Sequence, residues 1–192
     1  MTAPAPPSRG RLLELLVELS FERREVVLAS GQTSDFYIDC RQTALHPEGA
    51  FGIGHHLLDL VEALEATTGR TAGGVGGMTL GADPLATAVS LAAWTRGRHL
   101  PAFIVRKETK GHGTRSAVEG RRNLPDGTPV VMLEDAMTTG GSTLRAASTA
   151  REDGLDPWAV VSVVDRGAGA VERIEAAGYA VSTLFTPADL PL

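Results

Sequence analysis

The chain has 192 residues, 43% hydrophobic and 21% charged, which is ordinary for one soluble domain with a proper core. Its formal net charge of -5 argues against a general nucleic-acid binder, which needs a basic face. No apolar run approaches the roughly 18 residues of a membrane helix, and the N-terminus does not resemble a signal peptide. With a single cysteine, Cys40, these features favour a cytoplasmic protein without a membrane partner.

The part of the chain before residue 70 does not show a regular alternation of strands and helices. Residues 1–9 are rich in proline and are expected to form a disordered tail. Apolar spacing over residues 12–19 predicts an amphipathic helix, with Ser8 as its cap. Two short strands are expected at residues 26–30 and 36–40, followed by a long helix from Pro47 to Gly69.

From residue 71 onward, apolar strands alternate with helices. The expected strands are residues 71–77, 101–107, 128–136, 157–166 and 180–185, and the expected helices are residues 83–97, 141–154 and 169–178. This alternation is typical of an α/β fold, in which a parallel twisted sheet is flanked by helices. We therefore expect a single domain over residues 10–192, with residues about 10–45 contributing a small hood.

The stretch "VVMLEDAMTTGGST", residues 130–143, is the strongest local signal for a binding site. A buried strand leads into Glu134 and Asp135, and hydroxyls and glycines follow at the start of a helix. Such a loop presents backbone donors to a phosphate at the carboxyl end of a strand. The two acids would repel that phosphate, so they should face sugar hydroxyls or Mg²⁺ in the same ligand. The motif therefore predicts a sugar phosphate as ligand.

A cationic segment lies upstream of this motif. Residues 106–122 contain six Lys or Arg residues and two acids, and Lys107 and Lys110 are the only lysines of the chain. The segment has few apolar anchors and glycines at 111, 113 and 120, so we expect part of it to be mobile. A cationic island on an acidic protein indicates a small anionic ligand.

Several stretches resemble the orotate phosphoribosyltransferase family. "VMLEDAMTTGGS" is similar to the phosphoribosyl pyrophosphate (PRPP) signature of type I phosphoribosyltransferases, and "VRKETKGHG" to the mobile catalytic loop of the orotate branch. "ASGQTSDFYIDCR", "GGMTLGADPLATA" and "VVDRGAGA" also fit that branch and follow in the same order. The resemblance covers residues from about 29 to 170 and implies the type I phosphoribosyltransferase fold.

The resemblance implies transfer of the 5-phosphoribosyl group from PRPP to orotate, with Mg²⁺, giving orotidine 5'-monophosphate and pyrophosphate in pyrimidine synthesis. By this resemblance the catalytic residues would be Lys110, His112, Arg106 and Asp135. The PRPP-binding residues would be Arg106, Lys107, Lys110, His112, Glu134, Asp135, Ala136, Met137, Thr138, Thr139, Gly140, Gly141 and Ser142.

The resemblance also implies the remaining contacts. Thr138 and Arg166 would bind orotate, with the Arg166 fork on its carboxylate. The loop "GGMTLGAD" would hold the pyrophosphate and Mg²⁺ through its backbone, with the metal held mainly through PRPP. The cationic loop is shared across a homodimer in the family, so Arg106, Lys110 and His112 would serve the neighbouring subunit.

The chain departs from the family pattern at two positions. Thr33 and Leu80 stand where relatives often carry lysines that contact PRPP, which leaves more of the work to Lys107 and Lys110. Two alternatives stay open at this point: a transferase for another base, such as a purine, and a regulator that senses PRPP without catalysis. We expect the two tryptophans, Trp94 and Trp158, to be packing residues.

Overall fold

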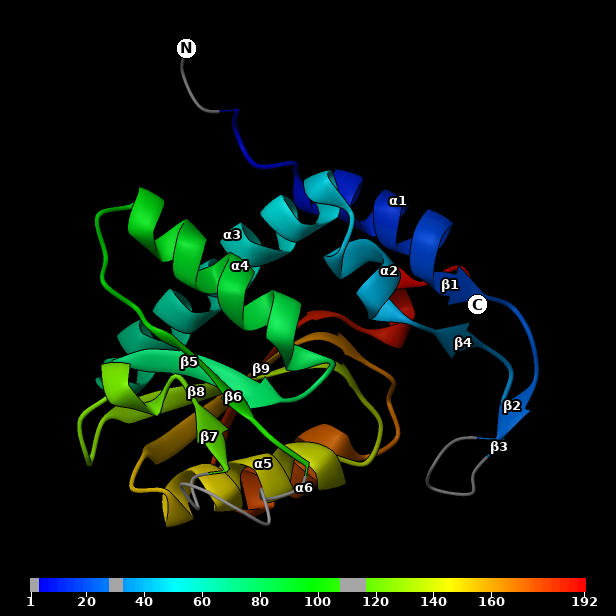
Figure 1. Ribbon diagram of the computed structural model, residues 1–192. Helices are drawn as coiled ribbons and strands as arrows, with labels where there is room; N and C mark the ends of the chain where they lie inside the picture. Colours follow the sequence, from blue (N-terminus) through cyan, green and yellow to red (C-terminus); the bar gives the residue numbers. More distant parts are fainter. Residues whose placement is uncertain (1–3, 28–32, 108–116) are drawn as a thin grey trace.

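The computed structural model describes residues 4–27, 33–107 and 117–192 as a sheet with helices on both faces (Figure 1). The sheet has six strands in the order β10-β9-β8-β5-β6-β7. Five of them, β5 (Gly74–Met78), β6 (Ala102–Val105), β8 (Pro129–Met137), β9 (Asp156–Asp165) and β10 (Ala180–Phe185), are parallel. None of the described helices is long and apolar enough to cross a membrane.

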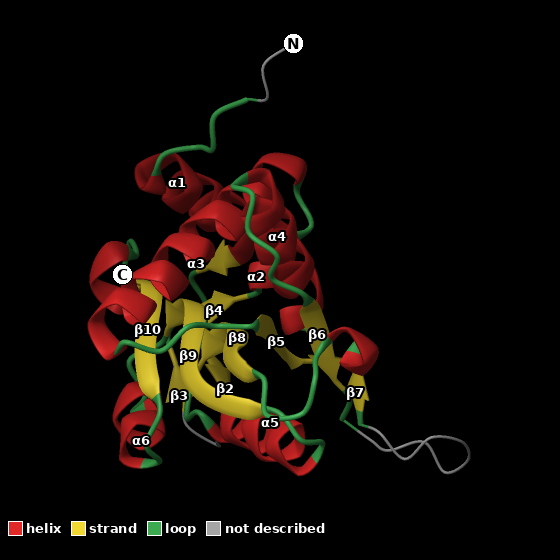
Figure 2. Cartoon of the chain, turned by 90° about the vertical axis from the view of Figure 1, so that its left-hand side faces the viewer, coloured by secondary structure: helices red, strands yellow, loops and turns green. Residues whose placement is uncertain are grey.

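The helices form two layers, one on each face of the sheet (Figure 2). One layer contains α1 (Arg9–Ser20), α3 (Pro47–Thr68) and α4 (Ala82–Thr95), and the other contains α5 (Gly141–Glu152) and α6 (Ala170–Ala176). Successive residues of β8 supply the two cores: Val131 and Leu133 pack with the first layer, Val130 and Met132 with the second. Burial on both faces explains why the strands are apolar throughout. The α/β prediction is confirmed.

The predicted helix boundaries follow the capping chemistry. The Ser8 hydroxyl accepts from the Arg11 amide at the start of α1. Pro47 occupies the first turn of α3, and Gly69 ends that helix in the left-handed conformation, with φ of 70°. Before α1, the Pro7 carbonyl lies 2.9 Å from His56 Nε2 of α3.

The structure describes four short N-terminal strands where two were expected, and residues 28–30 of the first expected strand lie outside the described residues. The structure has β1 (Phe21–Glu22), β2 (Val26–Val27), β3 (Thr33–Ser34) and β4 (Tyr37–Ile38), then α2 (Cys40–Ala44). They pair as β1 with β4 and β2 with β3, both antiparallel. β1 pairs with β4 across the intervening β2 and β3, so local patterns could not define that pair, whereas β2 and β3 are close in the chain. The Ser20 and Thr43 hydroxyls, 2.6 Å apart, connect α1 to α2.

Two further features differ from the sequence-based expectations. An edge strand, β7 (Val118–Glu119), pairs antiparallel with β6, and short 3-10 helices follow at Arg121–Asn123 and Pro187–Asp189. Trp158 is 4% exposed, as expected of a packing residue, but Trp94 is 69% exposed on α4 and the prediction for it was wrong. The buried residues beside it on α4 are the small Ala92 and Ala93, so the indole lies on the outer side of the helix.

Candidate active site

The predicted site residues gather at one edge of the sheet, where four adjacent parallel strands end. Thr79 follows β5, Arg106 follows β6, Thr138 follows β8 and Arg166 follows β9. Ligands of open parallel sheets bind at this edge. The sheet order β9-β8-β5-β6 therefore brings together residues that lie up to 87 positions apart in the chain.

Glu134 is the most enclosed acid of the site, with 6% of its surface exposed. Its Oε2 accepts hydrogen bonds from the hydroxyls of Ser142 at 3.0 Å and Thr143 at 2.8 Å. Burial, and then the charge of Asp135, raise the pKa of Glu134 to about 7. Glu134 therefore joins the end of β8 to the first turn of α5, and its ionisation is sensitive to pH near neutrality.

Asp135 is more accessible and lies beside the loop after β5. Its Oδ1 accepts from the Ala136 amide at 2.9 Å. A Cβ on Gly81 would lie only 2.6 Å from the same oxygen. Only glycine can bring the loop backbone this close to the carboxylate.

The loop from Thr138 to Gly141 packs against α6. Gly140 adopts φ of 70°, and a Cβ there would lie 2.9 Å from Ile174 Cγ1. The Arg173 guanidinium donates to the Thr139 carbonyl at 3.2 Å. No described side chain caps α5, so the amides of its first turn stay open to an anion. Thr138 and Thr139 are half-buried, and Ser142 is exposed.

Arg166 lies between the sheet and the N-terminal strands. Its backbone amide donates to the Met137 carbonyl at 2.9 Å, next to the loop from Thr138 to Gly141. Its Nη2 donates to the Phe36 carbonyl at 2.7 Å, and its guanidinium carbon lies 4.6 Å from the centre of the Phe36 ring. Burial lowers the pKa of the Arg166 guanidinium. A partly desolvated arginine at this point is well suited to a planar carboxylate.

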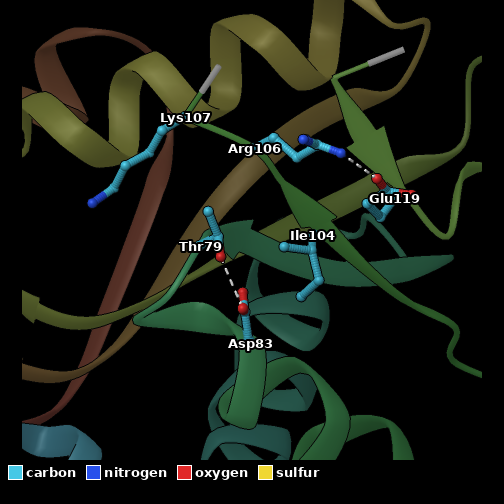
Figure 3. Close-up of a pocket in the computed structure, with 6 residues that line it drawn as sticks. All are labelled: Thr79, Asp83, Ile104, Arg106, Lys107 and Glu119. Atoms are coloured by element: carbon cyan, nitrogen blue, oxygen red, sulfur yellow. Dashed lines mark hydrogen bonds and ion pairs between the residues drawn. The ribbon is translucent and has the colours of Figure 1, made fainter. Parts of the chain in front are cut away.

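An open pocket of about 520 Å³ lies beside the loop after β5 (Figure 3). Its lining residues are Thr79, Asp83, Ile104, Arg106, Lys107 and Glu119. Arg106 Nη1 pairs with Glu119 Oε1 at 3.0 Å, across β6 and β7 (Figure 3). Lys107 is exposed. Lys110 and His112 lie outside the described residues, as does Arg115.

The described residues contain no group of three His, Cys, Asp or Glu side chains that could hold a metal ion. Glu134 is occupied by two hydroxyl donors, which leaves Asp135 as the more accessible carboxylate. This donor set fits Mg²⁺ only if phosphate oxygens of a ligand supply most of its coordination, as is common for Mg²⁺.

Several site residues were missed by the sequence analysis. Thr143 donates to Glu134, Phe36 contacts Arg166, and Glu119 pairs with Arg106. Gly81 belongs to the expected pyrophosphate loop, but its close approach to Asp135 was not expected. Thr143 could have been found from its place in the first turn of the helix after the glycines. The others depend on contacts between distant segments.

Comparison with known proteins gives a consistent result. No protein-family model matches the chain. The chain is 47% identical over 189 residues to the orotate phosphoribosyltransferase of Sorangium cellulosum, covering 98% of this chain and 96% of that protein. A crystal structure of the Mycobacterium tuberculosis orotate phosphoribosyltransferase is 40% identical, with a TM-score of 0.79 and coverage of 97% of this chain and 100% of that chain.

The same M. tuberculosis enzyme has been solved with 5-phospho-alpha-D-ribosyl 1-diphosphate (PRPP), and that structure is 38% identical with a TM-score of 0.77. It covers 97% of this chain and 100% of that chain. The similarity therefore extends over the N-terminal strands as well as the sheet.

Proposed function

Because the chain belongs to the orotate phosphoribosyltransferase family, we propose how its own residues divide the work of that reaction. The enzyme transfers the 5-phosphoribosyl group of PRPP to orotate, giving orotidine 5'-monophosphate and pyrophosphate in pyrimidine biosynthesis. The observation that carries the division of roles is that the acids of β8, Arg166 after β9 and the Thr79–Gly81 loop after β5 lie at the carboxyl ends of three adjacent strands.

The loop from Thr138 to Gly141, here called the phosphate loop, binds the 5'-phosphate of PRPP. Backbone amides from Thr139 to Ser142 donate to its oxygens, which is supported by the uncapped N-terminus of α5. Ala136, Met137 and Thr138 complete the wall between this loop and the acids. Glu134 and Asp135 accept hydrogen bonds from the ribose hydroxyls.

Departure of pyrophosphate leaves positive charge on the ribose and negative charge on the leaving group. The Asp135 carboxylate stabilises the ribose cation, and Arg106, Lys107, Lys110 and His112 stabilise the pyrophosphate. His112 can also donate a proton to the leaving group near neutral pH. Bound Mg²⁺, held mainly by PRPP oxygens, would neutralise part of the pyrophosphate charge.

Orotate lies between the hood and the sheet. The Arg166 fork binds its carboxylate, and Thr138 contributes a hydroxyl. The contact of Arg166 with the Phe36 carbonyl supports this position, because it directs the guanidinium into the space between the two parts of the protein. On this proposal residues about 10–45 form the hood of a single domain.

The enzyme works in the cytoplasm as a homodimer with shared sites, and it needs neither nucleic acid nor a membrane. Support for a dimer comes from α4, where Leu91 is 61% exposed and Trp94 69% exposed. Residues three apart on a helix share one face, so these side chains form an apolar patch that association would cover.

The activity is tested by following the ultraviolet absorbance of orotate with PRPP and Mg²⁺. Consumption of orotate that requires PRPP is expected. Turnover of a purine base with no turnover of orotate would contradict the assignment.

Sharing of the site between subunits needs a separate test. Lys110→Ala and Asp135→Ala variants should each be inactive, and mixed dimers should recover activity, because one of their two sites contains both intact residues. Failure of mixing to restore any activity, in dimers shown to exchange subunits, would contradict shared sites.

A further inference from the structure

The loop from Thr79 to Gly81 contacts both the pocket of Figure 3 and the acid pair of the site. Thr79 lines the pocket, whereas Gly81 packs against Asp135. Leu80, between them, is 64% exposed, so its side chain does not anchor the loop. The conformation of this loop must therefore be set by contacts at its two ends.

Three contacts hold these ends. The Thr79 amide donates to the Val105 carbonyl at 2.9 Å, which extends the pairing of β5 with β6. The Thr79 hydroxyl donates to Asp83 Oδ2 at 2.9 Å (Figure 3). Gly81 contacts Asp135 closely. Of these three contacts between described residues, the Thr79–Asp83 bond joins the start of the loop to the helix that follows it.

One carboxylate oxygen of Asp83 is buried, although the residue lines the open pocket. Its Oδ1 is buried and has no hydrogen-bond partner among the residues that the structure describes. Burying a carboxylate oxygen costs free energy unless a hydrogen bond or a nearby positive charge compensates. Its place in the first turn of α4 offsets part of that cost through the helix dipole.

The charge of Asp83 is unfavourable for pyrophosphate, the ligand proposed for this pocket. The pocket is lined by two carboxylates, Asp83 and Glu119, and by Arg106 and Lys107, and Glu119 already pairs with Arg106. A direct contact of Asp83 with the anion therefore does not explain its presence. Its hydrogen bond to Thr79 does, because that bond sets the direction of the Leu80 and Gly81 backbone.

We propose that Asp83 is a positioning residue for pyrophosphate: by holding the Thr79 hydroxyl, it orients the loop backbone toward the pyrophosphate group of PRPP. The proposal rests on the orotate phosphoribosyltransferase activity stated above. It also fits the leucine at position 80, since a loop without a lysine there must act through its backbone.

The test measures binding of magnesium pyrophosphate and of ribose 5-phosphate by calorimetry. Asp83→Ala should weaken pyrophosphate about 10-fold, the effect expected for loss of a hydrogen bond to a charged group, and leave ribose 5-phosphate within about twofold. Thr79→Val should have the same effect, and the double variant should be no worse than either single variant. Asp83→Asn keeps an acceptor for Thr79 and should restore binding to within about threefold of wild type.

Unchanged pyrophosphate binding in Asp83→Ala would overturn the proposal. An equal loss of both ligands, together with a lower melting temperature and no rescue by Asp83→Asn, would also overturn it by showing a merely structural role. Wild-type protein that binds both ligands but does not consume orotate would refute the activity instead. The comparison of pyrophosphate binding between the variants would still test the role of Asp83.

Discussion

The half of the site proposed for the 5'-phosphate and the half proposed for pyrophosphate are built in different ways. In the phosphate half, Glu134 is buried under two hydroxyl donors and Gly140 packs directly on α6. In the pyrophosphate half, an open pocket is lined by a partly exposed Arg106–Glu119 pair and an exposed Lys107. The first half is preorganised by packing, and the second depends on charges that remain in contact with water.

This difference has a chemical reason. The 5'-phosphate keeps its charge throughout the reaction, so a rigid loop can bind substrate and product alike. The pyrophosphate gains charge as it leaves, so groups that meet it late contribute to the transition state more than to binding. Substitutions in the first half should therefore be costly for stability or binding, and those at the rim of the second should cost little stability.

The largest expected effect is on the pH dependence of stability, through Glu134. Its pKa is about 7 in the folded chain and 4.5 when unperturbed, so the folded state holds the proton more tightly. Stability from this group is present below pH 4.5 and is lost as pH rises through about 7. A shift of this size corresponds to on the order of 3 kcal/mol.

Urea unfolding of the ligand-free chain between these pH values measures this loss. Glu134→Gln should remove most of the decline, whereas Glu175→Gln, at an exposed position on α6, should keep it. An identical decline in wild type and Glu134→Gln would show that Glu134 is not the group responsible.

The second-largest expected effect is that of Gly140→Ala on kcat/KM for PRPP. The added Cβ would contact Ile174 at 2.9 Å in a backbone conformation that alanine disfavours, so the loop must move. Displacing a positioning loop can cost roughly 100-fold in kcat/KM for PRPP. Steady-state kinetics test this.

Gly97→Ala is the matched control for this substitution. Gly97 has φ of 74° but no atom within 4 Å of an added Cβ, so only backbone strain is introduced. Its kcat/KM should match wild type. Equal kinetic losses in both variants would contradict the packing explanation.

A smaller, selective effect is expected at Arg166. Arg166→Ala should raise the KM for orotate by about 10-fold or more, because a charged hydrogen-bonded pair is lost, and should leave the KM for PRPP nearly unchanged. Arg122→Ala, at an exposed arginine after β7, should change neither value. An unchanged KM for orotate in Arg166→Ala would remove this residue from the base site.

The smallest effect is expected at the rim of the pyrophosphate half. The Arg106–Glu119 pair joins side chains that are 32% and 59% exposed, and such pairs contribute roughly 0–1 kcal/mol to stability. Glu119→Gln should therefore leave the free energy of unfolding within about 1 kcal/mol of wild type. A much larger loss in chemical unfolding would show that this half is as rigidly built as the other.

The extent to which the sequence predicted the structure follows the same division. The strand and glycine loop from residue 130 to 143 are contiguous, so their chemistry could be read directly, and the alternation after residue 71 predicted the sheet. The β1–β4 pair, β7, and the contacts of Gly81 and Arg166 depend on segments that only the fold brings together. Trp94 was misjudged because one aromatic residue on a helix does not reveal which side of the helix is buried.

The most direct test of the two-half description is a crossed binding experiment with Gly140→Ala and Asp83→Ala. Calorimetry should show that Gly140→Ala loses ribose 5-phosphate but keeps magnesium pyrophosphate, and that Asp83→Ala does the reverse. If both variants lose both ligands to the same degree, the site is a single cooperative unit and the division is wrong.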